Sequence, residues 1–212
     1  MSARLTGMRT KTEKSEHTLA AIVDQALDLA STEGLGALSL GELAKRVGIS
    51  KSGVFARVGS LEALQAAVLE EYERRFNELI FAPAMREPRG LPRLTMLMMR
   101  WIDVGVDPRG AGGSLHGAGA FQLERVNVVL RDRLLQGSLN WRRTLRRSVA
   151  EALEVGHLRA DTDPEQLAFE LGGLMMGYLF DARFGIPETS PERIRTAYWR
   201  LISTYRRFDA AD

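Results

Sequence analysis

Cysteine is absent from this sequence of 212 residues, which excludes disulfide bonds and thiolate metal sites. A chain without cysteine suits a reducing compartment, and we expect the protein to lie in the cytoplasm. Long apolar runs are also lacking. The longest, from Leu171 to Phe180, contains three glycines and spans about ten residues, whereas a membrane-spanning helix needs about 20. The N-terminal segment lacks the apolar stretch of a secretory signal and is interpreted as a polar arm.

Catalytic patterns are missing too. The sequence has three histidines, His17, His116 and His157, which are too scattered for the spacing of metal ligands. It contains no glycine-rich phosphate loop and no nucleophile-elbow motif, and Ser114 near His116 is interpreted as ordinary turn chemistry. We therefore expect no enzymatic activity, no metal and no cofactor. A helical enzyme is the alternative from another functional class.

Basic residues are concentrated near the N-terminal end of the chain, although the net charge of the whole sequence is small. The net charge is +2 and the sequence pI is about 9.1, values that do not by themselves establish a nucleic-acid partner. The segment from Leu43 to Leu61 has four basic residues and no acidic one, and Arg4, Arg9, Lys11 and Lys14 precede the first expected helix. An isolated basic run is often a solvated face, so its meaning depends on the local structure.

Helical spacing and cap signals predict a helix-turn-helix in the first 60 residues. Apolar residues recur at helical spacing up to Gly34, which is placed to end the first helix. Ser39 opens a capping box with Glu42 at the start of a short second helix. The turn 48–50 begins with glycine and ends on Ser50, which can cap a third helix.

The remaining residues predict further helices and no strands. The stretches 83–92 and 105–113 are rich in proline or glycine and predict breaks. Ser60 opens a fourth helix, and Asp163 and Ser190, each followed by proline, open the last two helices. The expected fold class is therefore all-α with about nine helices. The expected domains are an N-terminal arm and helix-turn-helix DNA-binding domain over residues 1–60 and a helical effector-binding and dimerisation domain over residues 61–212.

The segment from Ile22 to Val68 resembles the N-terminal DNA-binding region of the tetracycline-repressor (TetR/AcrR) family. The resemblance covers roughly a quarter of the chain and is carried by the pair Ala26-Leu27, the Gly34 stop, the run Leu40-x-x-Leu43-Ala44-x-x-Val47-Gly48-Ile49-Ser50-Lys51, and Ser60-x-Glu62-x-Leu64. The remainder looks like one of the family's ligand-binding domains, including the Gly112-Gly113 turn and the connection Leu158-Arg159-Ala160-Asp161-x-Asp163-Pro164.

The resemblance implies a bacterial, ligand-responsive, DNA-binding transcriptional regulator that acts as a homodimer. We expect a repressor that a small apolar or aromatic effector releases from palindromic operator DNA by shifting the fourth helix, residues 60–79. Phe55, Val58 and Leu61 stand where the family usually has tyrosine, phenylalanine and lysine. A helical ligand-binding or partner-binding protein with weakened DNA binding is therefore an alternative.

The third helix is expected to enter the major groove of DNA with its N-terminus first, so the side chains at its start reach base edges. Lys51 is the main candidate, for a guanine edge or a phosphate. Phe55 is interpreted either as a contact to thymine methyl groups or as a core aromatic. The residues expected to contact DNA are Ser39, Lys45, Arg46, Ser50, Lys51, Ser52, Gly53, Phe55, Ala56 and Arg57.

The last two helices are expected to form the dimer interface, because in the resembling family they pair with their copies as a four-helix bundle. Gly173 and Gly177 lie four residues apart on one helical face and permit a close backbone approach. In the alternative, they accommodate neighbours within the same chain. The expected interface residues are Gly173, Leu174, Gly177, Tyr178, Tyr198, Leu201 and Tyr205.

Methionine and aromatic side chains of the middle helices are expected to form core, and some of them an effector cavity. Trp101, Phe121 and Trp141 are favoured because they lie on the helices that form the pocket in the resembling family. His116, Asn140 or Gln122 would orient the effector. The expected ligand-binding residues are Met99, Trp101, His116, Phe121, Asn140, Trp141, Phe169 and Met176.

Overall fold

Helices are the regular elements of this protein. The computed structural model describes residues 11–105, 115 and 127–207, and within these ranges the chain forms helices and no strand. The elements are α1 (Lys11–Glu33), the 3-10 helix η1 (Leu35–Ala37), α2 (Leu40–Val47), α3 (Lys51–Val58), α4 (Leu61–Phe76), the π-helical turn η2 (Asn77–Phe81), α5 (Ala82–Met85), α6 (Leu91–Gly105), α8 (Val128–Glu154), α9 (Pro164–Arg183) and α10 (Pro191–Tyr205). The predicted all-α fold class is confirmed.

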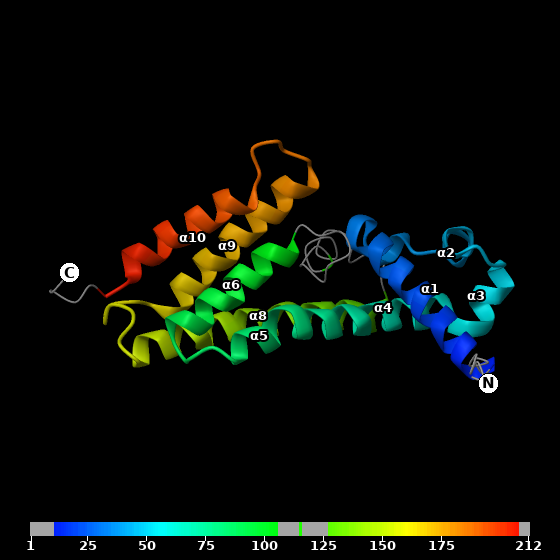
Figure 1. Ribbon diagram of the computed structural model, residues 1–212, viewed down its shortest axis with the longest axis horizontal. Coiled ribbons are helices and arrows are strands. Elements are labelled where there is room, and N and C mark those ends of the chain that lie inside the picture. Colours follow the sequence, from blue (N-terminus) through cyan, green and yellow to red (C-terminus); the bar gives the residue numbers. More distant parts are fainter. Residues whose placement is uncertain (1–10, 106–114, 116–126, 208–212) are drawn as a thin grey trace, which may run out of the picture.

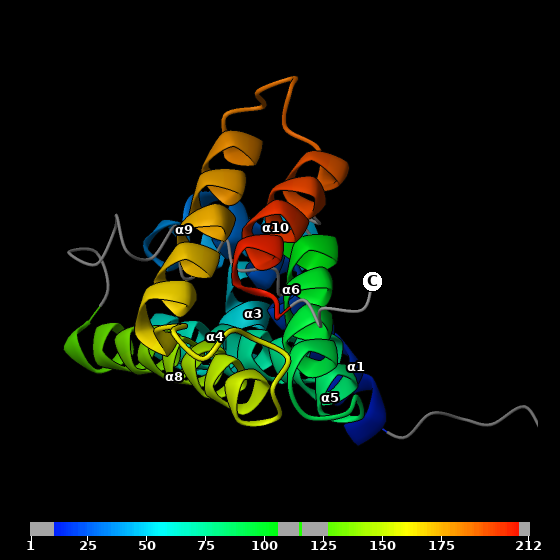
Figure 2. The same cartoon turned by 90° about the vertical axis from the view of Figure 1, so that its left-hand side faces the viewer.

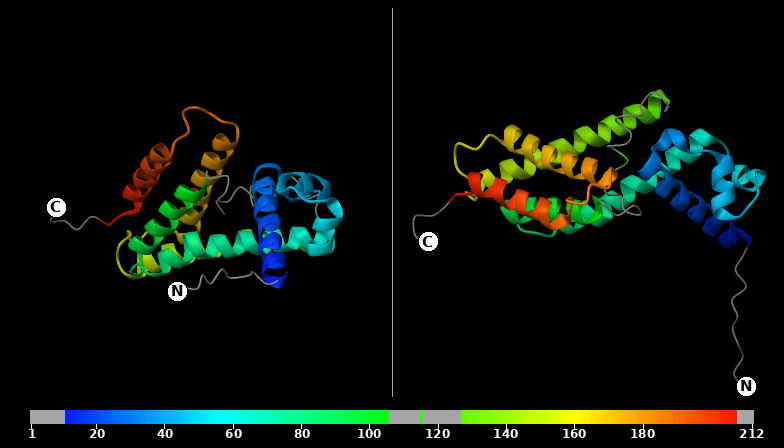
Figure 3. Two further views of the ribbon diagram at one scale, coloured as in Figure 1. Left: turned by 45° about the vertical axis from the view of Figure 1, so that its right-hand side comes forward. Right: turned by 90° about the horizontal axis from the view of Figure 1, so that it is seen from above.

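The helix α4 runs along the molecule and connects its two ends (Figure 1). At one end it packs against α1 and α3, and at the other it continues through η2 into α5. The helices α6, α9 and α10 lie side by side and stand above α8 when the molecule is seen end-on (Figure 2). Two further views show the α1–α3 unit set apart from these helices, with α4 running between the two groups (Figure 3).

Two hydrophobic cores lie at these two groups of helices, and α8 contributes to both, with Leu130 and Leu134 in the first core and Leu145 and Val149 in the second. The first core contains Leu43, Val54 and Tyr72, and the second contains Trp101 and Tyr198 among its buried side chains. The first half of α4 contributes to the first core, and η2 to the second. The helix therefore belongs to both cores. The division after residue 60 stays a prediction.

The predicted break 83–92 is found at residues 86–90, but its predicted start at Pro83 is wrong, because the helical path continues through this residue to Met85. Proline has no N–H for the carbonyl four residues earlier, which is that of Leu79. The Arg100 Nε atom of α6 donates a hydrogen bond to this Leu79 oxygen at 2.9 Å. The widened turn η2 lies at the same place, as is usual where an α-helix takes up an irregularity. The tertiary contact thus permits proline inside the helix.

The turn before α6 depends on a glycine. Gly90 has a φ of +96°, a conformation that side-chain-bearing residues rarely adopt. A Cβ atom on Gly90 would lie 2.6 Å from Nδ1 of His157 and 2.6 Å from Cγ2 of Val155. The imidazole is held in place, because its Nδ1 accepts a hydrogen bond from the N–H of Leu91 at 3.1 Å. His157 therefore caps the start of α6 and leaves no room for a larger residue at position 90.

Gly90→Ala is expected to lower the free energy of unfolding by about 1–3 kcal/mol, because the new Cβ strains a positive φ and displaces His157. The matched control is Gly41→Ala inside α2, where no neighbouring atom lies within 4 Å of the Cβ position. Alanine at that position should raise stability by up to about 1 kcal/mol. Urea unfolding followed by circular dichroism measures both variants, and equal stability of the two would contradict this account of the turn.

Candidate functional site

The crossing of α2 and α3 is fixed by the turn between them. Gly48 ends α2 in the left-handed conformation, with φ of +73°. The N–H of Ile49 donates to the carbonyl of Ala44 at 3.0 Å and so ties the turn back to α2. Leu43 and Val54, one from each helix, are completely buried and pack in the same core. These contacts form the helix-turn-helix that the sequence predicts.

Serine side chains begin both helices. The Ser39 Oγ accepts from the N–H of Glu42 at 3.2 Å, and the Ser50 Oγ accepts from the N–H of Gly53 at 3.0 Å. The reciprocal half of the predicted capping box is not formed in the described structure, because the Glu42 carboxylate accepts from Arg46 Nε at 3.3 Å. The Ser50 hydroxyl is therefore a cap, a role that is compatible with a phosphate contact.

One face of α3 points to solvent. Lys51, Ser52, Ala56 and Arg57 are exposed, and the side chain of Phe55 is 55% exposed. The interpretation of Phe55 as a core aromatic is therefore wrong. The Arg57 Nη1 atom donates to the carbonyl of Gly53 at 2.8 Å, which holds the guanidinium along the helix. The face thus offers cations, a hydroxyl and an apolar ring together.

The structure brings the predicted DNA-binding residues together on α2, α3 and their caps. Lys45 and Lys51 are exposed, and neither has an ion-pair partner among the described residues. This unit lies at the end of the molecule away from α9 and α10 (Figure 1). The charges are thus presented on an open end of the protein, where a large anionic partner has access.

Ion pairs fix α4 on two sides. The Arg75 Nη2 atom lies 2.5 Å from an oxygen of Asp24 in α1, and its Nε atom lies 2.7 Å from Glu71 in α4 itself. On another side, the Nη2 atom of Arg133 in α8 lies 2.5 Å from an oxygen of Glu73. Because these side chains are partly exposed, each pair contributes modestly to stability. They nevertheless determine which helices α4 is tied to.

Glu71 stays ionised under any physiological condition. Arg74 donates to both carboxylate oxygens of Glu71 at 2.7 Å. These hydrogen bonds from Arg74 lower the pKa of Glu71 to about 2, well below its usual value, and Arg75 acts in the same direction while desolvation opposes both. Glu71 therefore stays charged and holds the Arg75 guanidinium from within α4, while Asp24 of α1 accepts from the Arg75 Nη2 atom.

Aromatic rings connect α6, α8 and α4 in a row. Trp101 of α6 and Trp141 of α8 meet edge to face, with centroids 4.9 Å apart and planes at 82°. Trp141 meets Phe76 of α4 in the same way, at 4.9 Å and 86°. Phe76 lies 6.1 Å from Tyr72, which is buried in the first core. Contacts between rings therefore run from the second core into the first.

The two indoles of this row have unused donors. The Nε1 atoms of Trp101 and Trp141 are buried, and neither has a hydrogen-bond partner among the described residues. A buried indole N–H usually finds an acceptor, and a donor left without one costs about 1–3 kcal/mol. The sequence favours both residues as ligand contacts, but it contains no signal that their N–H groups would be unpaired.

The other predicted ligand-binding residues are placed in different surroundings. Met99 is half-buried and packs against the second core, whereas Asn140 is exposed and accepts from Arg143 Nη1 at 2.9 Å. Phe169 and Met176 of α9 are 68% and 44% exposed, so the structure does not bring them to the indoles. His116 and Phe121 lie outside the described residues.

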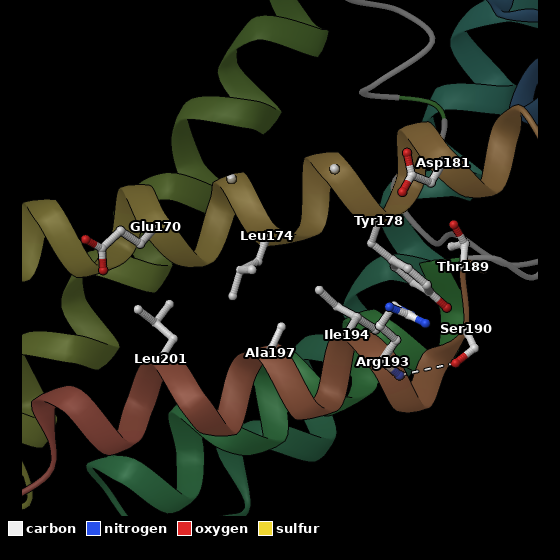
Figure 4. A pocket seen from close by; sticks show the side chains of 12 residues that line it. Glu170, Leu174, Tyr178, Asp181, Thr189, Ser190, Arg193, Ile194, Ala197 and Leu201 are labelled. Atoms are coloured by element: carbon white, nitrogen blue, oxygen red, sulfur yellow. Dashed lines mark hydrogen bonds between the residues drawn. The ribbon is translucent and has the colours of Figure 1, made fainter. Parts of the chain in front are cut away.

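A groove of about 520 Å³ runs between α9 and α10. Leu174 and Tyr178 from α9 and Leu201 from α10 point into it (Figure 4). Over the described ranges, no neighbouring atom lies within 4 Å of a Cβ position on Gly173 or Gly177. The alternative that these glycines accommodate neighbours within the chain is therefore wrong, and their surface is open.

The two remaining predicted interface residues form bonds within the protomer. Tyr198 is completely buried, and its hydroxyl lies 2.7 Å from the Thr95 hydroxyl, so it cannot reach a partner. The Tyr205 hydroxyl donates to Glu170 at 2.9 Å at one end of the groove. Exposed apolar side chains of α9 and its C-cap residue that are not among the predicted interface residues are Phe169, Met176, Phe180 and Phe184.

The described residues contain no cluster of three or more side chains that would hold a metal ion. Over the same ranges, no helix is long and apolar enough to cross a membrane.

Two family models match the chain. Residues 22–68 match the model described as bacterial regulatory proteins, tetR family, and residues 90–198, more than half of the chain, match a tetracyclin repressor-like C-terminal domain. The chain belongs to the tetR family. This tetR-family protein is a ligand-responsive, DNA-binding transcriptional regulator, as the sequence predicts.

Solved structures of other regulators share the fold of this tetR-family protein. A TetR regulator from Chloroflexus aurantiacus matches with a TM-score of 0.73 and 23% identity over 92% of this chain and 99% of its own. CprB from S. coelicolor A3(2) matches with a TM-score of 0.73 and 22% identity over 93% of each chain. AibR, solved with isovaleryl coenzyme A and operator DNA, matches with a TM-score of 0.68 and 19% identity over 85% of this chain and 95% of its own. None of the curated proteins matches the chain significantly.

Proposed function

We propose that this regulator is a repressor whose dimer binds a palindromic operator through two copies of α3 and leaves it when a small effector occupies the α6–α8 core. The observation that carries the proposal is the solvent-facing side of α3, where Lys51, Ser52 and Phe55 are exposed together. Because such a protein acts where the DNA is, the cytoplasm is its proposed location.

The start of α3 is suited to contact DNA. The free N–H groups and the dipole at a helix N-terminus attract phosphate, and Lys51 adds a full positive charge at that position. Lys45 and Arg57 flank it and would contact phosphates, which fixes the orientation of the protein on the duplex. Phe55 is placed to touch thymine methyl groups, a contact that reads sequence. These roles are proposed from exposure and charge.

A palindromic operator requires a second copy. One helix-turn-helix buries too little surface for specific binding, and dimers solve this by spanning half-sites about 34–36 Å apart. The proposed dimer face is the exposed apolar side of α9 together with the open groove beside α10. Contiguous apolar surface of this kind is typical of protein interfaces.

A buried tyrosine lines the same face. The Tyr178 side chain is 5% exposed, and among the described residues its hydroxyl has no hydrogen-bond partner. Desolvation raises the pKa of Tyr178, so the hydroxyl is neutral. The ring of Tyr178 lines the α9–α10 groove (Figure 4), where a second copy would pack against it.

The route from effector to DNA passes through α4. Phe76 packs against both hydrophobic cores and meets Trp141 edge to face. An effector that displaces Trp141 would move Phe76, and α4 would carry this movement to the α1–α3 unit through Arg75 and Asp24. The separation of the two α3 helices in the dimer would then change. By linkage, operator DNA weakens effector binding by the factor that the effector weakens DNA binding.

Lys51→Ala is expected to weaken binding to an operator duplex that the wild-type protein has selected from a random pool. The salt dependence of affinity should also flatten, by about 0.9 in the logarithmic slope for each phosphate that the side chain no longer neutralises. Fluorescence anisotropy across a range of salt concentrations measures both quantities.

The matched control is Arg142→Ala, which removes the same charge from an exposed position of α8 far from α3. It should leave affinity and slope unchanged. If the wild-type protein selected no palindromic duplex, or if Lys51→Ala bound with wild-type affinity and slope, the proposed DNA contact would be wrong.

Phe180→Glu is expected to convert the dimer into a monomer, because a charge buried in an apolar interface without a partner is costly. Val129→Glu is the control, since Val129 is 71% exposed on α8, outside the proposed face, and should leave the dimer intact. Light scattering after size exclusion measures the mass relative to the 23.6 kDa chain. A monomeric wild-type protein, or a dimeric Phe180→Glu variant, would exclude this interface.

A further inference from the structure

We infer that the effector is an uncharged molecule with a carbonyl-type or ether-type oxygen, which accepts hydrogen bonds from the indole N–H groups of Trp101 and Trp141, and with an apolar body that packs beside Phe76. The inference rests on the proposed function, because it names the chemistry of the proposed effector.

The unused donors carry the inference. Trp101 of α6 is 6% exposed, and its Nε1 atom and that of Trp141 in α8 are both buried without a hydrogen-bond partner in the part of the chain that the structure describes. An indole N–H can donate and cannot accept, so only an acceptor satisfies it. The two rings are in edge-to-face contact on facing helices, so both unsatisfied donors belong to one small region of the core.

The contacts between the rings do not satisfy the two indole N–H donors. The edge-to-face geometry of Trp101 and Trp141, with planes at 82°, lets an N–H point toward a neighbouring ring face. An N–H group over a ring is a weak hydrogen bond compared with an N–H group on an oxygen. The two indole N–H groups would therefore still gain by donating to an oxygen instead of to the faces of the neighbouring rings.

The surroundings favour a neutral molecule. Among the described residues, Glu151 is the buried charged side chain, and it is already paired with Arg93 of α6. Arg100, the charged neighbour of Trp101 in the sequence, is already bound to the Leu79 carbonyl and lies 3.7 Å from Asp103. An effector with a full charge would lose its water without gaining a counter-ion from these residues, and this desolvation is costly.

The position also explains why such a molecule would be sensed. Trp141 touches Trp101 on one side and Phe76 on the other. Phe76 packs against both cores, so an oxygen that reorients the Trp141 indole acts directly on the side chain that joins them. The Trp141 ring would thus both bind the effector and pass its effect to Phe76.

Three small probes test this chemistry. Acetophenone has a ring and a carbonyl oxygen, ethylbenzene has a similar shape without the oxygen, and benzoate has oxygens and a charge. Each is titrated into the full-length protein while proton–nitrogen correlation NMR follows the indole N–H resonances. Trp101, Trp141 and Trp199 give these resonances, and Trp199 is the internal reference because it lies on α10 and is 50% exposed.

Acetophenone is expected to shift the Trp101 and Trp141 resonances downfield in a saturable way and to leave Trp199 unchanged. Ethylbenzene should bind about tenfold more weakly, because it cannot accept a hydrogen bond. Benzoate should give no saturable shift at these two residues. The double variant Trp101→Phe, Trp141→Phe keeps aromatic rings but removes the donors, and it should bind both neutral probes with the same weak affinity. Trp199→Phe is the matched control and should behave as wild type.

The inference is overturned if acetophenone shifts neither buried indole, if ethylbenzene or benzoate binds as tightly as acetophenone, or if the double variant keeps wild-type affinity for the ketone. The comparison of the three probes on the wild-type protein needs no variant, so it decides the question even if the double variant fails to fold.

Operator affinity measured with the same ketone separates this inference from the proposed function. If the indole resonances shift as expected while operator affinity stays constant, the coupling fails and the ligand chemistry stands. If the wild-type protein binds its selected duplex but acetophenone leaves both indoles unchanged, the ligand chemistry fails and the DNA-binding role stands.

Discussion

Phe76 packs against both hydrophobic cores, and the architecture of the protein depends on this shared position. A separate domain usually has its own core and an exposed linker. Here α4 is buried in one core as far as Tyr72 and continues into Ile80 of η2, which is buried in the other core, and α8 also contributes to both. The α1–α3 unit and the helices behind it are therefore joined by packed side chains, which transmit displacement better than a flexible linker does.

Polar contacts determine how this helix is held. Arg75 ties it to α1 through Asp24, and Arg133 of α8 ties it through Glu73. Farther along, Arg100 of α6 donates to the Leu79 carbonyl that Pro83 leaves free. Each contact joins the path of α4, η2 and α5 to a different helix. Through these contacts, the proposed movement of α6 or α8 would reach the helix on which α1 and α3 rest.

Local signals in the sequence were sufficient for the helix-turn-helix and for most helix starts. Ser50 and Gly48 act through neighbouring backbone groups, so their roles can be read from spacing alone. Whether the helix continues through Pro83 depends on Arg100, which is distant in the sequence, and local patterns could not reveal this contact. Burial of Tyr198 on Thr95 and exposure of Phe169 likewise depend on how whole helices pack.

The central claim is that α4 couples the two ends through Phe76, and it can be tested without any effector. The operator duplex is added to the dimer while NMR follows the indole N–H resonance of Trp141, with the exposed Trp199 as reference. We predict a shift of Trp141 that saturates with DNA binding and becomes smaller in Phe76→Leu. An unchanged Trp141 resonance in the DNA-saturated protein would contradict the account.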